Sequence, residues 1–456
     1  MIKNLKKTIV IAGATGFIGR WIIDIFKKDY NIVALSRRKT LKSIYDNVTW
    51  REVDLYSISS TENALKGADY AIYLVHSMQP STRLNQGKFE DTDLLLADNF
   101  SRGANANKVE QIIYLGGIIP KDNQQISKHL NSRLEVEKTL ASKDVPVTAI
   151  RAGIIIGPGG SSFKIIRKLV EKLPIMACPS WTRSLNQPVD VFETIDVIKS
   201  CIGNKRFYNN FIEIGGSKIM SYMELLKLTS ILMNKKRIIF SVPIITVGIS
   251  KFWVSIFTGS SLNFVSPLVE SLKHKMLPDN SFNDKFSIKR IKIEDSIKNA
   301  LTNKPPVLPS FKAIKKEKNT VRSVQRISNP SLRDTSWIAN QYPIWITKKF
   351  AGIINAKFDG IFLTFWFLNI KFLELKLIKD RSDEKRQLYY ITGGVLVKRV
   401  DYGWLEFRSI SDNKFIIVAI HEFVPKLPWI IYKYTQAIAH LYVMKSFEKY
   451  LINLKN

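Results

Sequence analysis

Three glycines near the N-terminus have the spacing of a loop that holds a phosphate group. Residues 8–12 are a short β-branched run, and residues 13–19 then carry a glycine at every third position. Apolar residues follow at helical spacing from Ile18 to Phe26. In such a strand, turn and helix, the glycines allow a tight turn, close approach of a pyrophosphate and close helix packing. The free N–H groups at the helix start face the phosphates. The sequence therefore predicts a dinucleotide site contacted by Gly13, Thr15, Gly16, Phe17, Ile18 and Gly19.

Two arginines follow the next predicted strand, residues 31–35. The segment reads Ser36-Arg37-Arg38 where an NAD site usually has an acidic residue for the ribose 2′-hydroxyl. Arginine suits a 2′-phosphate instead. NADP(H) is therefore predicted over NAD(H), with Arg37 and Arg38 as phosphate contacts. The alternative is that both arginines are simply solvated.

Later strands are predicted at residues 49–53, 70–75, 111–115 and 147–150, with helices between them. This alternation predicts an α/β fold with a doubly wound parallel Rossmann sheet. The carboxyl ends of its strands lie beside the cofactor. The predicted contacts there are Asp54, which can accept a hydrogen bond from the adenine amino group, and Leu55, Val75, His76 and Ser77.

These segments resemble the extended or atypical short-chain dehydrogenase/reductase superfamily, in its epimerase/dehydratase-like and NmrA-like branches. The matching segments are 13–19, 53–55, 73–78 and 151–159. The whole chain is similar to YbjT-type bacterial proteins, in which a second domain of unknown function follows the reductase-like domain. Segments 73–78, 129–133, 242–243, 250–253 and 267–272 carry that similarity. The resemblance implies NAD(P) binding, and our leading hypothesis is an oxidoreductase acting on a hydrophobic carbonyl or quinone-type substrate.

The usual catalytic groups of that superfamily are missing. Its members normally have a serine or threonine after the fifth strand and a Tyr-x-x-x-Lys on the next helix, where the tyrosine is the acid/base. Here the strand ends in Gly116-Gly117, and the sequence contains no Tyr-x-x-x-Lys. His129 and Arg133 stand in its place, on one helix face. We predict His129 as the proton donor and Arg133 as the cation that holds the ribose. The alternative is a non-catalytic NADPH-sensing or scaffold protein; the resemblance includes a respiratory complex I subunit that binds NADPH structurally.

The sequence after the glycine loop also predicts where the Rossmann domain ends, a small substrate lobe within it and a linker behind it. Residues 1–302 are expected to form the Rossmann domain, with a small substrate lobe at 189–302 that includes a strand at 211–214. Ser161, Ser162, Trp181 and Arg183 are candidate lining residues of a substrate cleft. A basic, proline-containing linker is expected at 303–328.

Residues 329–456 predict a C-terminal α+β domain. Strand-like runs are found at 361–371, 373–378, 387–391, 394–400, 403–408 and 415–423, and an amphipathic stretch follows Pro428. The arrangement resembles the helix-grip lipid-binding fold, in which a curved antiparallel sheet wraps a helix around an apolar cavity. Its candidate polar groups are His421, Glu422, Gln436 and His440. His421 and Glu422 are adjacent on a strand and point to opposite faces, so no metal site is predicted.

The amino-acid composition and net charge limit the classes of binding partner that the sequence predicts. Of 456 residues, 45% are hydrophobic, which excludes a disordered chain. The net charge is +30, of which only +5 lies in residues 1–150 (21 basic, 16 acidic). We find no nucleic-acid-binding motif, so no specific nucleic acid is expected. Two cysteines and no cleavable leader predict a cytoplasmic protein. An anionic membrane surface is an alternative partner, through the basic second half and residues 238–269.

Overall fold

The chain divides into two compact units. One comprises Met1–Gln79 and Leu96–Ile314, and the other comprises Pro80–Leu95 and Lys315–Asn456. We call them the Rossmann unit and the C-terminal unit. The computed structural model describes residues 6–40, 43–77, 84–120, 126–242, 248, 254–257, 259, 261–279, 289–312, 320–410 and 413–454.

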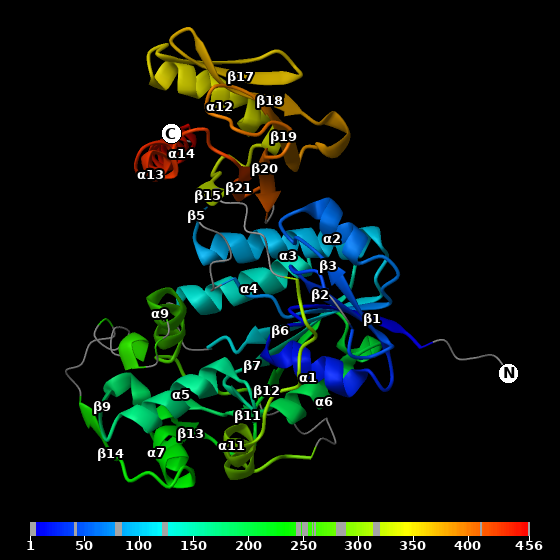
Figure 1. Cartoon of the computed structure of the whole chain (residues 1–456), viewed down its shortest axis with the longest axis vertical. Coiled ribbons are helices and arrows are strands. Elements are labelled where there is room, and N and C mark those ends of the chain that lie inside the picture. Colours follow the sequence, from blue (N-terminus) through cyan, green and yellow to red (C-terminus); the bar gives the residue numbers. More distant parts are fainter. Residues whose placement is uncertain are drawn as a thin grey trace, which may run out of the picture. The chain divides into compact units, whose positions relative to one another are not determined.

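The Rossmann unit is built on a seven-stranded parallel sheet (Figure 1). Its order is β12-β7-β6-β4-β1-β2-β3, so the direction of winding changes between β1 and β4. The predicted doubly wound sheet is confirmed. The strands are β1 (Thr8–Ala12), β2 (Asn31–Ser36), β3 (Val48–Glu52), β4 (Tyr70–Tyr73), β6 (Gln111–Gly117), β7 (Val147–Ala152) and β12 (Asn210–Ile214).

Helices cover both faces of this sheet because its central strands are apolar on both sides. On one face, α1 (Phe17–Phe26) and α6 (Val191–Cys201) contribute to a core with Ile9, Ile11 and Ile212. On the other, α2 (Ile58–Ala64), α3 (Phe89–Ala106) and α4 (Lys128–Leu140) contribute to a core with Val10 and Tyr73. Both α6 and β12 lie inside the segment expected as the small lobe. The structure corrects this expectation, since β12 pairs in parallel with β7 and is the seventh strand of the main sheet.

The remaining lobe has its own apolar core. It is formed by α5 (Ser161–Lys172), α7 (Tyr222–Leu232) and α11 (Ile293–Thr302), together with the pair β9 (Ile175–Pro179) and β14 (Ile238–Val242). A further helix, α9 (Leu262–Ser271), contacts α4. Two-residue strands β8 (Ile155–Ile156), β10 (Leu185–Asn186), β11 (Val189–Asp190) and β13 (Met220–Ser221) complete it.

The C-terminal unit contains an eight-stranded sheet of order β16-β17-β18-β19-β20-β21-β15-β5. All neighbours are antiparallel except β15 and β5. The strands are β5 (Leu84–Gln86), β15 (Val321–Ser328), β16 (Ile354–Phe358), β17 (Phe362–Phe367), β18 (Ile370–Leu377), β19 (Arg386–Gly393), β20 (Trp404–Ile410) and β21 (Phe415–Phe423). The predicted α+β class is confirmed, with α12 (Thr335–Lys349), α13 (Trp429–Tyr434) and α14 (Gln436–Asn453) as its helices.

Three features of this unit differ from the sequence prediction. Part of the expected linker is β15, and residues 80–95 of the expected Rossmann domain belong to this unit. No strand forms at 394–400. Gly394 has a φ of +113°, and a Cβ there would lie 2.3 Å from the Phe372 carbonyl oxygen, so the chain turns at this point.

Candidate nucleotide and catalytic site

The glycine loop joins β1 to α1 with the geometry that its spacing predicts. Gly13 has a φ of +88°, which a residue with a side chain rarely adopts. A Cβ on Gly19 would lie 2.4 Å from the Gly13 carbonyl oxygen, so only glycine fits between the turn and the helix. Gly16 is exposed at the N-cap of α1, and the first turn of that helix carries no acidic residue. The free N–H groups of α1 are therefore open to an anion.

A cavity of about 320 Å³ opens beside this loop, at the carboxyl ends of β1, β4 and β6. It brings together eight of the predicted site residues: Gly13, Gly16, Phe17, Ile18, Gly19, His76, His129 and Arg133. Ser161 and Ser162 also line it, whereas Trp181 and Arg183 do not. The change in winding direction of the sheet produces this crevice.

Two histidines face each other in the cavity wall. His76 follows β4, and His129 lies in the first turn of α4, where Ser127 caps the helix by accepting the Leu130 N–H at 3.3 Å. The ring centroids of His76 and His129 are 5.0 Å apart, with the planes inclined by 37°. Ser127 also hydrogen-bonds Ser271 of α9 at 2.9 Å, which positions the start of α4 against the lobe. Imidazole titrates near neutral pH, so this wall can supply a proton.

Arg133 lies one turn further along α4 and is 7% exposed. Its Nη2 donates to the Leu115 carbonyl oxygen at 3.1 Å, and its guanidinium lies 5.3 Å from the Tyr114 ring centroid. Among the described residues, Nη1 has no hydrogen-bond partner and no carboxylate pairs with the guanidinium. A buried cation without a counter-ion is costly unless an acceptor or an anion approaches it. The residues present therefore fit a nucleotide.

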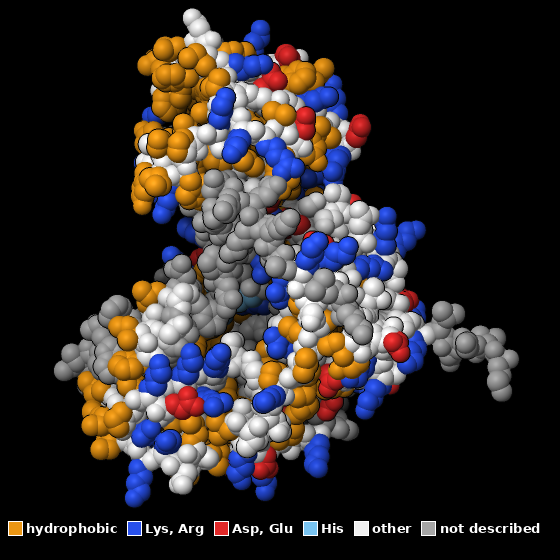
Figure 2. Space-filling model, in the orientation of Figure 1, with side chains coloured by type: hydrophobic (Ala, Val, Ile, Leu, Met, Phe, Trp, Pro, Cys, Tyr) orange, Lys and Arg blue, Asp and Glu red, His pale blue; other side chains and the backbone are white. Residues whose placement is uncertain are grey.

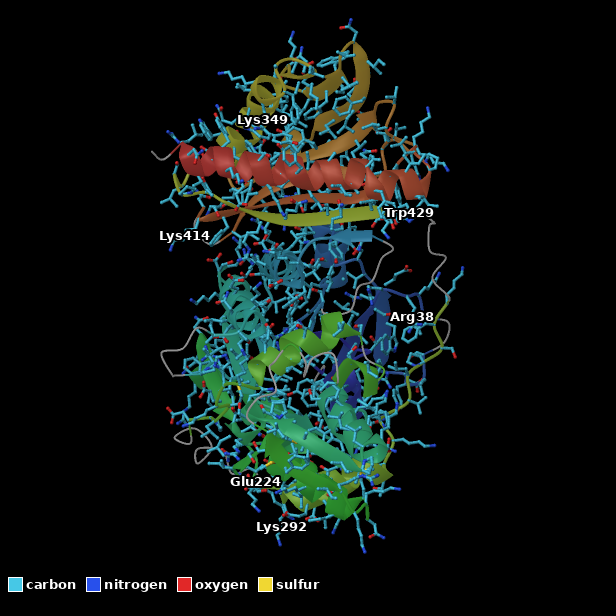
Figure 3. The ribbon with its side chains drawn as sticks, turned by 90° about the vertical axis from the view of Figure 1, so that its left-hand side faces the viewer. Arg38, Glu224, Lys292, Lys349, Lys414 and Trp429 are labelled. Atoms are coloured by element: carbon cyan, nitrogen blue, oxygen red, sulfur yellow. The ribbon has the colours of Figure 1, made fainter. Side chains whose placement is uncertain are left out.

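The remaining predicted contacts lie outside this cavity. Arg37 and Arg38 are exposed beyond the end of β2, and Arg38 is labelled in Figure 3. The Arg38 guanidinium lies 4.6 Å from the Phe311 ring centroid, whereas Arg37 has no hydrogen bond or ion pair with any described residue. Asp54 accepts the Tyr56 N–H at 3.2 Å and so closes the turn after β3. Thr15, Leu55, Val75 and Ser77 do not line the cavity either.

Sequence patterns did not reveal every lining residue. Tyr222 begins α7 and is 5% exposed, and burial raises the pKa of its phenol. Leu268, Ser271 and Met276 reach the same cavity from the segment around α9. No local motif marks these residues, because they reach the site only through the tertiary packing of the lobe.

Comparisons with known proteins agree with this geometry. A family model of NAD(P)H-binding domains matches residues 13–171. The auxiliary protein GraX of Staphylococcus aureus is 29% identical over 125 residues, which are 27% of this chain and 40% of GraX. The chain therefore matches only about two fifths of that relative. A UDP-glucose 4-epimerase of Vibrio cholerae is 22% identical over 269 residues, 53% of this chain and 80% of the enzyme. These matches support an atypical short-chain dehydrogenase/reductase type for the NAD(P)-binding Rossmann unit.

Solved structures support the fold of this short-chain reductase-type domain. A Citrobacter triphenylmethane reductase aligns with a TM-score of 0.51 at 16% identity, over 65% of this chain and all of that one. A nucleoside-diphosphate-sugar epimerase of Staphylococcus aureus also gives 0.51, at 12% identity over 64% of this chain and 99% of the epimerase. The Bordetella bronchiseptica enzyme WbmG, in complex with NAD and UDP, gives 0.51 at 13% identity over 66% and 95%. At these identities the likeness establishes the fold alone.

The polar candidates of the C-terminal unit separate into two groups. His421 is fully buried and lies 3.1 Å from Glu406, which also pairs with Arg408 at 2.7 Å and Arg386 at 3.0 Å. Burial alone would raise the pKa of Glu406, but these positive neighbours hold it well below its usual value. Glu422 pairs instead with Arg322. Gln436 and His440 line a cavity of their own. Among the described residues, no three His, Cys, Asp or Glu side chains are grouped to hold a metal ion.

The surface carries its positive charge broadly. On the face in Figure 2, Lys and Arg side chains are spread over both units. Much of the candidate membrane-contacting segment, including 243–247 and 249–253, lies outside the described residues, as do Lys315, Lys316 and Lys318 of the basic linker. Within the described part of the chain, no helix is both long enough and apolar enough to span a membrane.

Proposed function

We propose that the Rossmann unit is an NADP(H)-dependent oxidoreductase acting on a hydrophobic carbonyl or quinone-type substrate. The observation that supports this is one cavity lined by the glycine loop, two facing histidines and a buried arginine. The apolar side chains of Leu268, Leu272 and Met276 complete its wall and suit a hydrophobic substrate.

Different parts of the nucleotide are held by different groups of the Rossmann unit. The glycine loop and the N–H groups of α1 hold the pyrophosphate. Arg37 contacts the ribose 2′-phosphate, since Ser36 stands where an acidic residue would repel it. Asp54 lies toward the adenine, and Arg133 holds the nicotinamide ribose through its unpartnered Nη1. Bound NADPH supplies a hydride.

His129 supplies the proton of the reduction. When the carbonyl carbon receives the hydride, negative charge develops on the oxygen, and a neighbouring imidazolium can transfer its proton there. The product is the alcohol, and the neutral imidazole then takes up a proton from water. His76, whose ring lies tilted against that of His129 at 5.0 Å, positions the His129 ring. Arg133 keeps a fixed positive charge near the developing oxyanion.

The test is NADPH oxidation with a panel of carbonyls and quinones, using the full chain. A general acid contributes about 10²–10⁴-fold, so His129→Ala is expected to lower kcat by roughly that factor with NADPH affinity retained. Lys128→Ala, an exposed neighbour on α4, serves as the control. Unchanged turnover of His129→Ala on every active substrate would refute the assignment.

A second candidate function is a non-catalytic NADPH sensor or scaffold. Gly116 and Gly117 line the cavity at the place where the resembling enzymes carry a catalytic hydroxyl, which favours this candidate. Calorimetric NADPH binding without oxidation across the whole panel would support it. Turnover of any panel member that depends on His129 would exclude it.

A further inference from the structure

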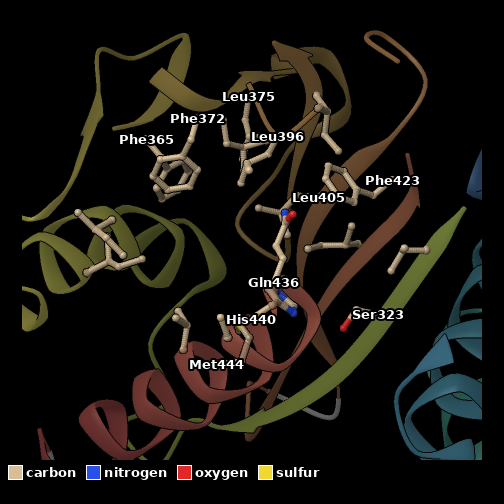
Figure 4. A pocket seen from close by; sticks show the side chains of 18 of the residues that line it. Ser323, Phe365, Phe372, Leu375, Leu396, Leu405, Phe423, Gln436, His440 and Met444 are labelled. Carbon is tan, nitrogen blue, oxygen red and sulfur yellow. The ribbon is translucent and has the colours of Figure 1, made fainter. Parts of the chain in front are cut away.

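A second cavity lies inside the C-terminal unit, separate from the nucleotide site. Its volume is about 460 Å³, within the ~300–1,000 Å³ usual for small-molecule sites. Figure 4 shows it between the sheet and α14. Representative lining residues are Phe365, Phe372, Leu375, Leu405, Phe423 and Met444. The cavity has the size and the position of a binding site within a domain core.

The sheet separates this cavity from the charged network of the same unit. Leu405 and Phe407 of β20 line the cavity, whereas Glu406 and Arg408 alternate with them and form the buried ion pair at 2.7 Å. Successive residues of a strand point to opposite faces, so this alternation keeps the charges on the other side of the sheet. Among the described residues that line the cavity, none is Asp, Glu, Lys or Arg.

The polar lining residues are few: Gln86, Ser323, Tyr342, Tyr432, Gln436 and His440. Gln86 donates to the Ala437 carbonyl oxygen at 2.9 Å, and Ser323 donates to the Gln86 carbonyl oxygen at 3.1 Å. These two side chains therefore already donate hydrogen bonds to backbone carbonyl oxygens of the protein.

Gln436 and His440 differ from them. They lie one helical turn apart on α14 and extend into the cavity in Figure 4. The Gln436 Oε1 is buried, and no described residue donates a hydrogen bond to it. Part of the His440 surface is accessible because it faces the cavity, but burial among apolar side chains lowers its pKa to about 4. At neutral pH the pair therefore offers hydrogen bonds without a charge.

We propose that this cavity binds an uncharged, mainly apolar molecule whose single hydroxyl group donates a hydrogen bond to the Gln436 Oε1 and lies within reach of His440. A buried amide oxygen that accepts no hydrogen bond is unfavourable, and a ligand hydroxyl would satisfy it. A carboxylate would lose its hydration with no cation in the wall to replace it. The site therefore selects alcohols over the corresponding acids.

The rim of the cavity suits the entry of such a molecule. Phe367, Ile370 and Val395 line the cavity and are also 49%, 56% and 50% exposed. An apolar molecule that approaches this edge meets apolar side chains from the surface inward.

The experiment compares two ligands that differ only in the head group. Equilibrium dialysis of labelled 1-dodecanol and labelled dodecanoate against the full chain at pH 8 measures both affinities. We expect dodecanol to bind at least tenfold more tightly. Equal affinities, tighter binding of dodecanoate, or no saturable binding of dodecanol would each overturn the proposal.

A variant locates the binding. Gln436→Leu is expected to weaken dodecanol about tenfold and dodecanoate much less, because it removes the head-group partner but keeps an apolar wall. Lys445→Gln, on the exposed face of the same helix, is expected to change neither affinity. An unchanged preference in Gln436→Leu would overturn the assignment of the head-group site, and the wild-type comparison does not depend on the folding of this variant.

Discussion

The two cavities of this protein use opposite chemistry. The Rossmann cavity is lined by glycine backbone, two histidines and a buried arginine with an unpartnered nitrogen. The C-terminal cavity is lined by aromatic and aliphatic side chains, with an uncharged amide and an uncharged imidazole among its few polar groups. The first wall therefore suits an anionic ligand and the second wall rejects one.

The difference follows from where each fold leaves unsatisfied groups. In the parallel sheet, a strand ends in a glycine turn and a helix start, whose N–H groups have no intrahelical partners. In the antiparallel sheet, neighbouring strands pair their backbone groups with one another, so the cavity wall is formed mainly by side chains. The charges of that sheet, Glu406, Arg408 and Arg386, satisfy one another on its other face.

The largest expected effect separates the two sites. Gly19→Val is expected to weaken NADPH binding about a thousandfold, roughly 4 kcal/mol, because its Cβ would lie 2.4 Å from the Gly13 carbonyl oxygen. Dodecanol binding in the C-terminal unit is expected to stay unchanged. Calorimetry and dialysis on the same preparation measure both. The control is Gly67→Asn, because a side chain at Gly67 would enter open space and asparagine tolerates its left-handed backbone. Near-normal NADPH affinity in Gly19→Val would show that the glycine loop does not bind the nucleotide.

The second prediction concerns pH, with opposite signs in the two units. Burial raises the pKa of Glu193 to about 7, so its contribution to Rossmann-unit stability is full below about 4.5 and is lost as pH rises through 7. Burial lowers the pKa of His440 to about 4, so its contribution to C-terminal-unit stability is full above about 6.5 and is lost as pH falls through 4. Each shift corresponds to roughly 3 kcal/mol.

Scanning calorimetry between pH 4 and pH 7 tests both contributions. Glu193→Gln is expected to flatten the pH dependence of one transition and His440→Gln that of the other. Glu193 accepts the Ile291 N–H at 2.5 Å, a bond that glutamine can keep. Identical pH profiles of the wild type and both variants would show that burial shifts the pKa of neither Glu193 nor His440.

A smaller effect is expected at the adenosine end of the site. Arg37→Ala is expected to lower the preference for NADPH over NADH about tenfold, since a hydrogen bond to a charged group contributes roughly 1.5–3 kcal/mol. Arg38→Ala is expected to change it less, because the Arg38 guanidinium already lies over Phe311 at 4.6 Å. Dissociation constants for both nucleotides measure this. A larger effect at Arg38 would reverse the two assignments, and no effect at either would exclude a 2′-phosphate site here.

Local patterns were sufficient to predict the first sheet and its loop. Apolar runs and glycine spacing place β1, β2 and α1 to within a residue, because periodicity and turn geometry are local properties. The joining of Leu84–Gln86 to Val321–Ser323 was not predicted. A parallel pairing between segments more than 200 residues apart leaves no pattern in the sequence of either segment. The basic charge of residues 312–326 led instead to the prediction of a linker.

The sequence predicted part of the nucleotide site and missed the residues that the lobe contributes to it. His76, His129 and Arg133 were found through the resemblance and the helical spacing, and they lie in one cavity. Tyr222 and Met276 were missed, since only the packing of the lobe brings them there. The C-terminal cavity was expected from a resemblance, but its uncharged wall depends on which face of β20 holds Glu406 and Arg408, and a strand pattern alone does not identify the inner face.

The smallest expected effect is at the glycines that replace the usual hydroxyl. A Cβ on Gly117 would lie 3.4 Å from Leu130 Cδ2, an ordinary contact, so Gly117→Ser is expected to change the free energy of unfolding by less than about 1 kcal/mol. A Cβ on Gly116 would lie 2.9 Å from Tyr114 Cε1, so Gly116→Ser is expected to cost about 1–3 kcal/mol. Urea unfolding compares the two variants. An unchanged free energy of unfolding in Gly117→Ser would mean that packing allows a hydroxyl in this cavity, so the missing hydroxyl would reflect the reaction or ligand of the site. A large decrease in the free energy of unfolding would instead show that packing requires glycine at this position.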